Sequence, residues 1–195
     1  ADDVKLPRMV HVAFLRSPLA HADIVKIETD KASSATGVIA VYNGKDLSKV
    51  CSPWVGVVTH LEGMRSPPQN LLAVDRVRWQ GEPVVAVVAQ TRALAEDAIE
   101  LIEIKYEELP LAVDMRTALD DDAEVIHKEY ENNLCWERNV NAGDVDSAFA
   151  EADVIVEEEF QFGRHTGVTL ESRSIVADYD PGEEMLTLYQ STQAP

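Results

Sequence analysis

The sequence predicts an α+β fold, in which a mixed sheet with short helices is followed by the first strands of an incomplete second α+β domain. Two cycles of strand and helix patterns occupy the first hundred residues. One apolar run has the length and composition of a buried central strand, and a hairpin pattern follows later, after a change of composition. With 195 residues, 46% of them hydrophobic, the chain can bury roughly 70% of its unfolded surface.

The first part of the chain predicts strands around one short helix. Asp30 is expected to cap this helix, which runs through Ser34, and Gly37 is expected to end it. Arg16-Ser17-Pro18 separates the first two strands. The strands are expected at Val10–Leu15, Ile24–Ile27 and Val38–Tyr42.

The middle of the chain contains an irregular stretch, followed by clear strand and helix patterns. Residues 51–70 contain several Pro and Gly residues, which predicts a long surface excursion that meets a partner domain or another chain. A strand is expected at Val77–Trp79, and Pro83–Ala89 is apolar on both faces, which indicates a central strand covered on each side. Thr91 is expected to cap an amphipathic helix, and the strand through Ile104 and Tyr106 follows it.

A composition change divides the chain into three parts. Residues 1–113 form the first predicted domain. Residues 114–142 are polar, with few periodic apolar positions, and predict a linker or extended arm. Residues 143–195 begin a second domain that the chain does not finish.

The second domain is expected to start with a brief helix and to continue with strands. Asp144 can cap the helix, which ends near Ala152. Val154–Phe162 alternates in a way that predicts a strand. A hairpin is expected from Ser174–Tyr179 and Met185–Tyr189, around Asp180-Pro181-Gly182.

Charge and cysteine content limit the function. A net charge of −18 without a stripe of Lys and Arg argues against nucleic-acid binding. No apolar run approaches the ~18 residues of a membrane helix. Cys51 and Cys135 lie far apart, which disfavours a disulfide framework or a thiolate zinc site and fits a reducing cytoplasm.

Searches for general catalytic motifs find no dinucleotide or phosphate-binding loop, no nucleophile elbow and no metalloprotease motif. The five histidines share no metal-ligand spacing, so each is interpreted as an ordinary surface or core residue: His11, His21, His60, His127 and His165.

The C-terminal stretch is the most informative one. A predicted strand, Met185 to Tyr189, runs directly into Ser191-Thr192-Gln193. A polar amide at the end of a strand usually serves a site, and no second half of that site follows. We therefore expect the chain to be part of a larger functional unit.

The order of several segments resembles one family. Each segment alone is weakly specific, but together they cover nearly the whole chain. The segments are Arg16-Ser17-Pro18-Leu19-Ala20-His21-Ala22, Gly37–Tyr42, Gly81–Ala89, Ala95–Ala98, Tyr106–Pro110, Gly143-Asp144-Val145, Leu170–Arg173, Ala177–Asp180 and Ser191-Thr192-Gln193. The first five resemble the hammerhead domain that opens the large subunit of molybdenum hydroxylases, the family of xanthine dehydrogenase, aldehyde oxidase and aerobic carbon monoxide dehydrogenase. The others resemble the beginning of that subunit's molybdopterin-binding region.

The resemblance implies hydroxylation of an electron-poor carbon, in a purine, an aldehyde or a related small molecule, with oxygen derived from water. It implies a molybdenum–molybdopterin cofactor shared with the remainder of the large subunit, and iron–sulfur clusters and FAD on partner domains or subunits. It implies that Gln193 sits beside the molybdenum, where its amide can donate a hydrogen bond to a metal ligand. The family's glutamate general base is expected beyond Pro195, so this chain carries no catalytic residue and is expected to be inactive alone.

Alternatives remain open from the sequence. His165 and Glu171 are candidates near the start of the second domain, with His165 as a weak substrate-pocket residue. The chain could instead be a non-catalytic hammerhead module for subunit assembly, or a free-standing small-molecule binder. Whether it is a fragment or one chain of a split large subunit also stays open.

Overall fold

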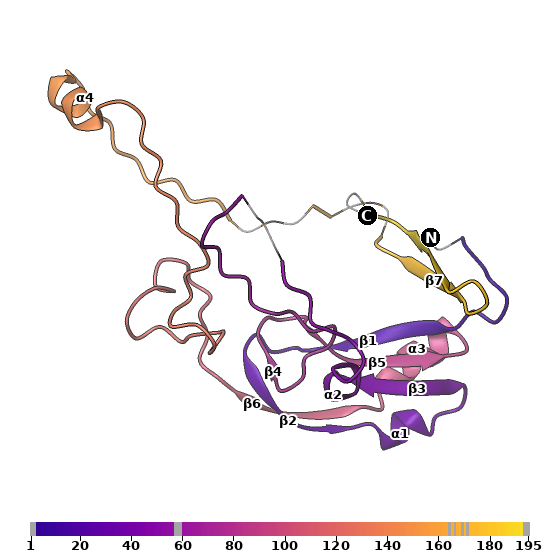
Figure 1. Ribbon diagram of the computed structural model, residues 1–195. Helices are drawn as coiled ribbons and strands as arrows, with labels where there is room; N and C mark the ends of the chain where they lie inside the picture. The colour runs from indigo at the N-terminus through magenta and orange to yellow at the C-terminus, as the bar shows by residue number, and fades with distance from the viewer. Residues whose placement is uncertain are drawn as a thin grey trace. The chain divides into compact units, whose positions relative to one another are not determined.

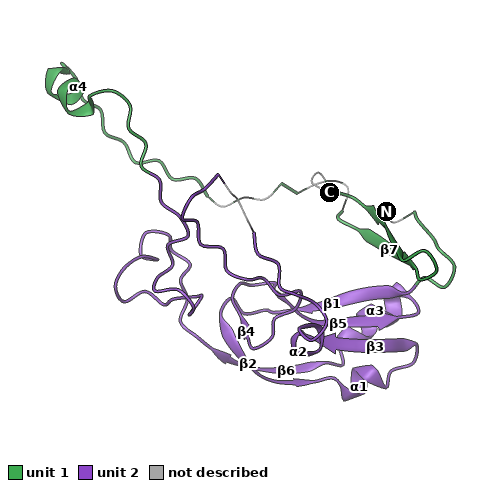
Figure 2. Ribbon diagram, viewed as in Figure 1, with its two compact units in different colours: residues 1–9, 139–195 green, residues 10–138 purple. Residues whose placement is uncertain are grey.

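The structure is a computed structural model that describes residues 3–56, 60–163, 165, 167–168, 170 and 172–192 (Figure 1). The chain forms two compact units: Val10–Arg138, and Ala1–Met9 with Asn139–Pro195 (Figure 2). Both units contain short helices and strands, so the predicted α+β class is confirmed.

The larger unit contains two three-stranded antiparallel sheets in place of one mixed sheet. In the first, β5 (Pro83–Ala89) lies between β1 (His11–Arg16) and β3 (Val38–Asn43). The central position predicted for residues 83–89 is confirmed, and Val84, Val85 and Val87 are fully buried. An apolar run on both faces thus marks a central strand even where its neighbours run antiparallel.

The second sheet has β2 (Ala22–Glu28) between β4 (Arg76–Val77) and β6 (Glu103–Glu108). Ala22 pairs with Val77 on one side and with Glu108 on the other. Both sheets contribute to one core, because their buried residues and those of the helix after β5 form a single cluster: Ala22, Ala32, Ala73, Val77, Val84, Val85, Val87, Ala98 and Ile102.

Two four-residue helices flank β3, and the sequence analysis was wrong about the details of both. The helix α1 (Asp30–Ser33) has Thr29, not Asp30, at its N-cap, without a side-chain cap. The helix α2 (Gly44–Leu47) was not predicted, because Asn43-Gly44 was interpreted only as the end of a strand. In the structure the Asn43 side chain accepts hydrogen bonds from the amides of Lys45 and Asp46, and Asp46 completes a capping box.

The helix α3 (Arg92–Ile99) confirms its prediction. The Thr91 hydroxyl accepts a hydrogen bond from the Leu94 amide at 3.3 Å, which satisfies one free donor of the first turn. Ala95 and Ala98 are buried on the stripe that packs against the sheet, so two small side chains allow a close approach of helix and strands.

The described residues of the stretch, 51–56 and 60–70, are irregular, as predicted, apart from a bridge between Trp54 and Gln69. This stretch meets the polar arm, which we define as residues 114–138. The Arg65 amide donates to the Cys135 carbonyl at 2.9 Å, and the Trp136 indole donates to the Glu62 carbonyl at 3.2 Å. The arm has no helix or strand, and it belongs to the same compact unit as the sheets.

The smaller unit contains α4 (Val145–Glu151) and a hairpin of β7 (Ile175–Asp180) and β8 (Met185–Gln190). The predicted cap is confirmed, because the Asp144 side chain accepts from the Ser147 amide at 3.0 Å. The hairpin is confirmed with Val176 opposite Tyr189. The strand predicted at 154–162 is wrong for this structure, which has no strand over these residues.

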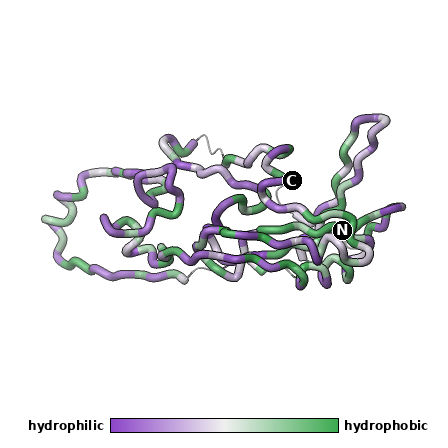
Figure 3. The backbone as a smooth tube through the Cα atoms, turned by 90° about the horizontal axis from the view of Figure 1, so that it is seen from below, coloured by the Kyte–Doolittle hydropathy of each residue, from purple (hydrophilic) through white to green (hydrophobic). Residues whose placement is uncertain are grey.

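The smaller unit has no hydrophobic core in the part that the structure describes. None of its described residues is buried, and Figure 3 shows hydrophobic residues, in green, along the segment around α4. Val154, Val156, Phe160 and Phe162 are 77–81% exposed. The apolar side chains of residues 154–162 thus alternate as in a strand, but no described part of the chain covers them.

Candidate functional site

The hairpin β7–β8 leads to the residue that the sequence analysis selected. Ile175 pairs with Gln190, and the Ser191 amide donates to the Ser174 carbonyl at 3.1 Å, so the ladder continues one step past β8. This pairing fixes the backbone as far as Ser191, which is half-buried. Gln193 itself lies outside the described residues, so its predicted position beside a cofactor stays a prediction.

The weak substrate-pocket candidate, His165, lies exposed on the segment before the hairpin. Its ring Nδ1 lies 3.2 Å from the Gly163 carbonyl oxygen, so it acts here on its own loop. Glu171, the other candidate of this region, lies outside the described residues. A substrate-pocket role for His165 therefore stays a prediction.

A shallow, open hollow lies beside α4. Its lining includes Val145 and Phe149 of the helix, and Val154, Ile155 and Val156 of the extended segment that follows. Its lining side chains are apolar apart from Asp144, which is occupied in capping the helix. Such a surface can receive an apolar side chain, but it offers no group for acid–base chemistry.

Metal binding by protein side chains finds no support in the described ranges. Nowhere in them do three or more His, Cys, Asp or Glu side chains gather in a way that could hold an ion. Cys51 and Cys135 are both free thiols. No helix in the same ranges is long and apolar enough to cross a bilayer.

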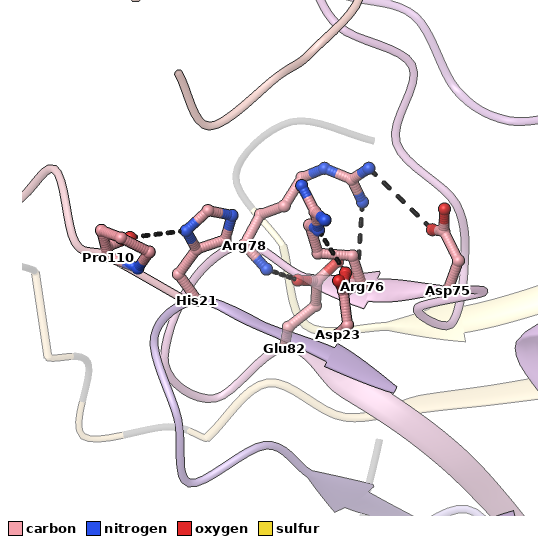
Figure 4. Close-up of polar contacts among 7 residues, drawn as sticks. All are labelled: His21, Asp23, Asp75, Arg76, Arg78, Glu82 and Pro110. Carbon is pink, nitrogen blue, oxygen red and sulfur yellow. Dashed lines mark hydrogen bonds and ion pairs between the residues drawn. The ribbon is translucent and has the colours of Figure 1, made fainter. Parts of the chain in front are cut away.

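A cluster of polar side chains that the sequence analysis did not single out lies on one face of the sheet β4-β2-β6. We call it the polar cluster, and Figure 4 shows its side chains together with Pro110, whose carbonyl oxygen lies beside His21: His21, Asp23, Asp75, Arg76, Arg78 and Glu82. Ala22 and Val77 pair and point into the core, so the alternating neighbours on each strand share the opposite face. The antiparallel register therefore sets His21 across from Arg78 and Asp23 across from Arg76.

Ion pairing organises this face. Arg76 Nε lies 2.6 Å from Asp23 Oδ1, and the Arg76 side chain is only 10% exposed. The hydrogen bond from Arg76 lowers the pKa of Asp23 below its ordinary value. Arg78 reaches both Asp75 and the Arg76 carbonyl.

Glu82 joins the cluster from the turn before β5. Its Oε2 accepts a hydrogen bond from the Arg78 amide at 2.6 Å. Burial raises the pKa of Glu82, although the amide and the charge of Arg78 oppose this shift. The carboxylate thus fixes the turn between β4 and β5, which is a structural role.

His21 is the most buried member of the polar cluster, with 2% of its surface exposed. Its Nδ1 lies 2.7 Å from the Pro110 carbonyl oxygen, which can only accept, so Nδ1 carries the proton. The Leu109 amide donates to the His21 carbonyl at 3.0 Å. Sequence reasoning allowed a core role for this histidine, but nothing in its spacing indicated that it holds the end of β6.

Comparison with known proteins decides which family this fold represents. Residues 1–110 match the model of the aldehyde oxidase and xanthine dehydrogenase a/b hammerhead domain, and residues 126–195 match that of the molybdopterin cofactor-binding domain. The chain belongs to the molybdenum hydroxylase family. The resemblance inferred from the sequence is confirmed, as is the order of the hammerhead domain and the start of the cofactor-binding domain.

Individual members of the molybdenum hydroxylase family match along the whole chain. The nicotine 6-hydroxylase large subunit of Paenarthrobacter nicotinovorans is 37% identical, over 100% of this chain and 24% of its own length. The nicotinate dehydrogenase large molybdopterin subunit of Eubacterium barkeri is 33% identical, over 100% of this chain and 43% of its own length. The crystal structure of quinoline 2-oxidoreductase from Pseudomonas putida 86 superposes with a TM-score of 0.92 at 35% identity, covering 98% of this chain and 24% of that one.

The chain thus spans about a quarter of the length of most of these molybdenum hydroxylase subunits. The apolar side chains of the smaller unit are exposed in the described chain. This exposure is expected for a chain that spans only part of the length of its relatives. The chain is a portion of a molybdenum hydroxylase large subunit.

Proposed function

We propose that this chain supplies the hammerhead domain and one wall of the cofactor pocket to an enzyme that hydroxylates an electron-poor carbon with oxygen from water. The match of both domains, in order, on one chain carries this proposal. The chain's own part is scaffolding and the placement of Gln193, and the complete enzyme also needs the remainder of the large subunit. The general base is expected on that remainder, so the chain alone is inactive.

The molybdopterin cofactor would supply the redox chemistry. The described residues offer no set of direct metal ligands, so the fit of this chain to the cofactor rests on the end of β8. There the ladder orders the backbone up to Ser191, two residues before Gln193. An uncharged amide in that position can donate a hydrogen bond to a metal ligand without adding a competing anion.

Within this reaction class, we favour a nitrogen-containing aromatic ring as substrate. Nicotine 6-hydroxylase and quinoline 2-oxidoreductase, by their names, act on such rings, and both cover nearly all of this chain at 35–37% identity. A carbon next to a ring nitrogen is electron-poor, which suits attack by an oxygen nucleophile.

The partners of the chain follow from the same proposal. They are the remainder of the large subunit and subunits that carry iron–sulfur clusters and FAD. An arrangement with a split large subunit is supported by the nicotinate dehydrogenase subunit, of which this chain covers 43% instead of a quarter. We also place the enzyme in the cytoplasm, in keeping with two free thiols.

Native purification of the assembly that contains this chain tests the proposal. We expect molybdenum in the metal analysis, iron–sulfur and flavin chains in mass spectrometry, and oxygen-18 from labelled water in the hydroxylated product. An intact assembly that contains no molybdenum, or a product that takes its oxygen from O₂, would contradict the proposal.

A pair of glutamine variants separates the enzyme from the alternative of a non-catalytic assembly module. We expect Gln193→Ala to lower kcat by about 10- to 100-fold in the assembled enzyme, because a hydrogen bond to a metal ligand is lost. Gln190→Ala is the control, since Gln190 is an exposed glutamine at the end of β8. Full activity of Gln193→Ala in an intact complex would favour the assembly module.

A further inference from the structure

The hairpin β7–β8 has two faces of different chemistry. Successive side chains of a strand point to opposite faces, and the register of the hairpin sets which residues share each face. One face carries Asp178 opposite Thr187, so it has a charged and a polar group at its centre. The other face, which we call the apolar face, is formed by the alternate pairs: Ile175, Ala177, Tyr179, Leu186 and Leu188.

The apolar face is exposed and carries no charge. Its four large side chains are 46–62% exposed, from Leu188 to Ile175. Gln190 lies opposite Ile175 and ends the face with an uncharged amide. The chain as a whole has a net charge of −18, so a face without a single carboxylate differs from the rest of the sequence. Exposed apolar side chains that gather in this way mark a contact with another polypeptide surface.

A hairpin of this kind needs a covering layer to stay folded. Two strands alone are marginally stable in water, and an apolar face is normally buried by further strands or by a second layer. None of the described residues of the smaller unit is buried, so the described part of that unit supplies no such layer. The covering layer is therefore expected from outside that unit.

The length of the relatives indicates which polypeptide supplies the layer. This chain spans about a quarter of the nicotine 6-hydroxylase large subunit and of the quinoline 2-oxidoreductase chain, so most of such a subunit lies outside it. Permanent contacts between parts of one subunit resemble a domain core and are depleted in charge. The apolar face fits such a contact, whereas covering the other face would remove Asp178 from water.

We propose that the apolar face of β7–β8 is the docking surface for the remainder of the large subunit, which covers it with an apolar surface of its own. This inference rests on the proposed function, in which that remainder is a partner of the chain. It adds the surface at which the two meet, three residues before Gln193 in the sequence.

Hydrogen exchange of the native enzyme that contains this chain, followed by mass spectrometry, tests whether the hairpin is covered. We expect the amides of β8 to exchange about 100-fold or more slowly than in an unfolded chain, because a hairpin without a covering layer opens readily. The buried strand β5 is the internal reference. Weaker protection of β8, in an enzyme whose β5 is protected, would contradict the proposal.

Two lysine variants at adjacent positions of β8 test which face is covered. Leu188→Lys places a charge on the apolar face, so we expect protection of β8 to fall by about tenfold or more, or the enzyme not to assemble. Thr187→Lys is the matched control, because it places the same charge on the other face, opposite Asp178, and should assemble with wild-type protection. Equal effects of both variants, or no effect of Leu188→Lys, would overturn the proposal.

A pair of alanine variants repeats the comparison without a new charge. Leu188→Ala should lower the protection of β8 by about tenfold, because it removes apolar contacts with the covering layer. Thr187→Ala should leave that protection unchanged. Wild-type protection in Leu188→Ala would show that the apolar face is not covered.

A photoreactive phenylalanine analogue in place of Tyr179 identifies what covers the apolar face. In the native enzyme, we expect cross-linked peptides from the part of the large subunit that lies outside this chain. Cross-links to a second copy of this chain, to its own residues 10–138, or to an iron–sulfur or flavin subunit would assign the face to another partner and overturn the proposal. The absence of any cross-link would also contradict it.

None of these measurements requires molybdenum or turnover. An enzyme without molybdenum whose apolar face cross-links to the remainder of the large subunit would overturn the proposed function and support this inference. A molybdenum-containing enzyme whose apolar face stays exposed would support the proposed function and overturn this inference.

Discussion

Single residues of the polar cluster show that the stabilisation from an ion pair depends on how far its side chains are exposed to water. The Arg76 side chain is 10% exposed and pairs with Asp23, whereas Lys31 and Glu103 form a pair whose side chains are 70% and 66% exposed. The two pairs have similar geometry. Water screens the attraction between Lys31 and Glu103 almost fully, so that pair adds much less to the free energy of unfolding than the pair of Arg76 and Asp23.

Replacement of Asp23 by Asn tests this difference. We expect Asp23→Asn to lower the free energy of unfolding of the larger unit by about 1–2 kcal/mol, because it leaves Arg76 charged and largely buried. The value is modest because the Asp23 side chain is 39% exposed and partly screened. Glu103→Gln, the control, should change stability by no more than about 0.5 kcal/mol in urea denaturation.

The same ion pair predicts a pH effect. Arg76 lowers the pKa of Asp23, so the contribution of the pair is complete above the unfolded pKa of about 4 and is lost as the pH falls further. The stability difference between wild type and Asp23→Asn should therefore shrink below about pH 4. A constant difference down to pH 2 would show that the ion pair is not its cause.

At the scale of elements, the sequence patterns identified most helices and strands but missed the helix α2. The strand β5 and the caps at Thr91 and Asp144 follow local rules, and the structure confirms them. The helix α2 has a local signal too, the capping box of Asn43 and Asp46, but its packing is not local: a Cβ on Gly44 would lie 2.1 Å from the Ala73 carbonyl oxygen. Residue 73 is far away in sequence, so no local pattern could reveal that contact.

Gly44→Ala measures that contact. We expect a loss of about 2–3 kcal/mol in unfolding free energy, because backbone must move to admit the methyl group. Gly163→Ala is the matched control, since nothing lies within 4 Å of a Cβ there and its backbone is not left-handed. A thermal denaturation in which both variants melt like the wild type would show that the helix and residue 73 separate easily.

At the scale of the whole molecule, the two units differ in what they bury. The larger unit has one shared core, and the smaller has no buried residue among those described. An apolar segment such as 154–162 forms a strand only when a neighbouring strand accepts it, because backbone donors and acceptors need partners. The sequence pattern for a strand was therefore present without the strand.

Two truncations test where stability resides. A chain that ends at Arg138 should melt within a few degrees of the full chain, because it keeps the shared core and the docked arm. A chain that ends at Val113 should melt lower, because it loses the hydrogen bonds that join the arm to Glu62 and Arg65. Equal melting temperatures would mean that the arm adds no stability.

The sequence by itself determined the α+β class, the central strand, most caps, the hairpin and the family, because these depend on local periodicity and on the order of short motifs. Only the tertiary structure decided that His21 holds the end of β6, that the arm is hydrogen-bonded to residues 62–65, and that Gly44 packs against Ala73. Those features join residues 29–89 positions apart in the chain, from Gly44 with Ala73 to His21 with Pro110. Contacts at such separations arise from packing of whole elements, which no local pattern encodes.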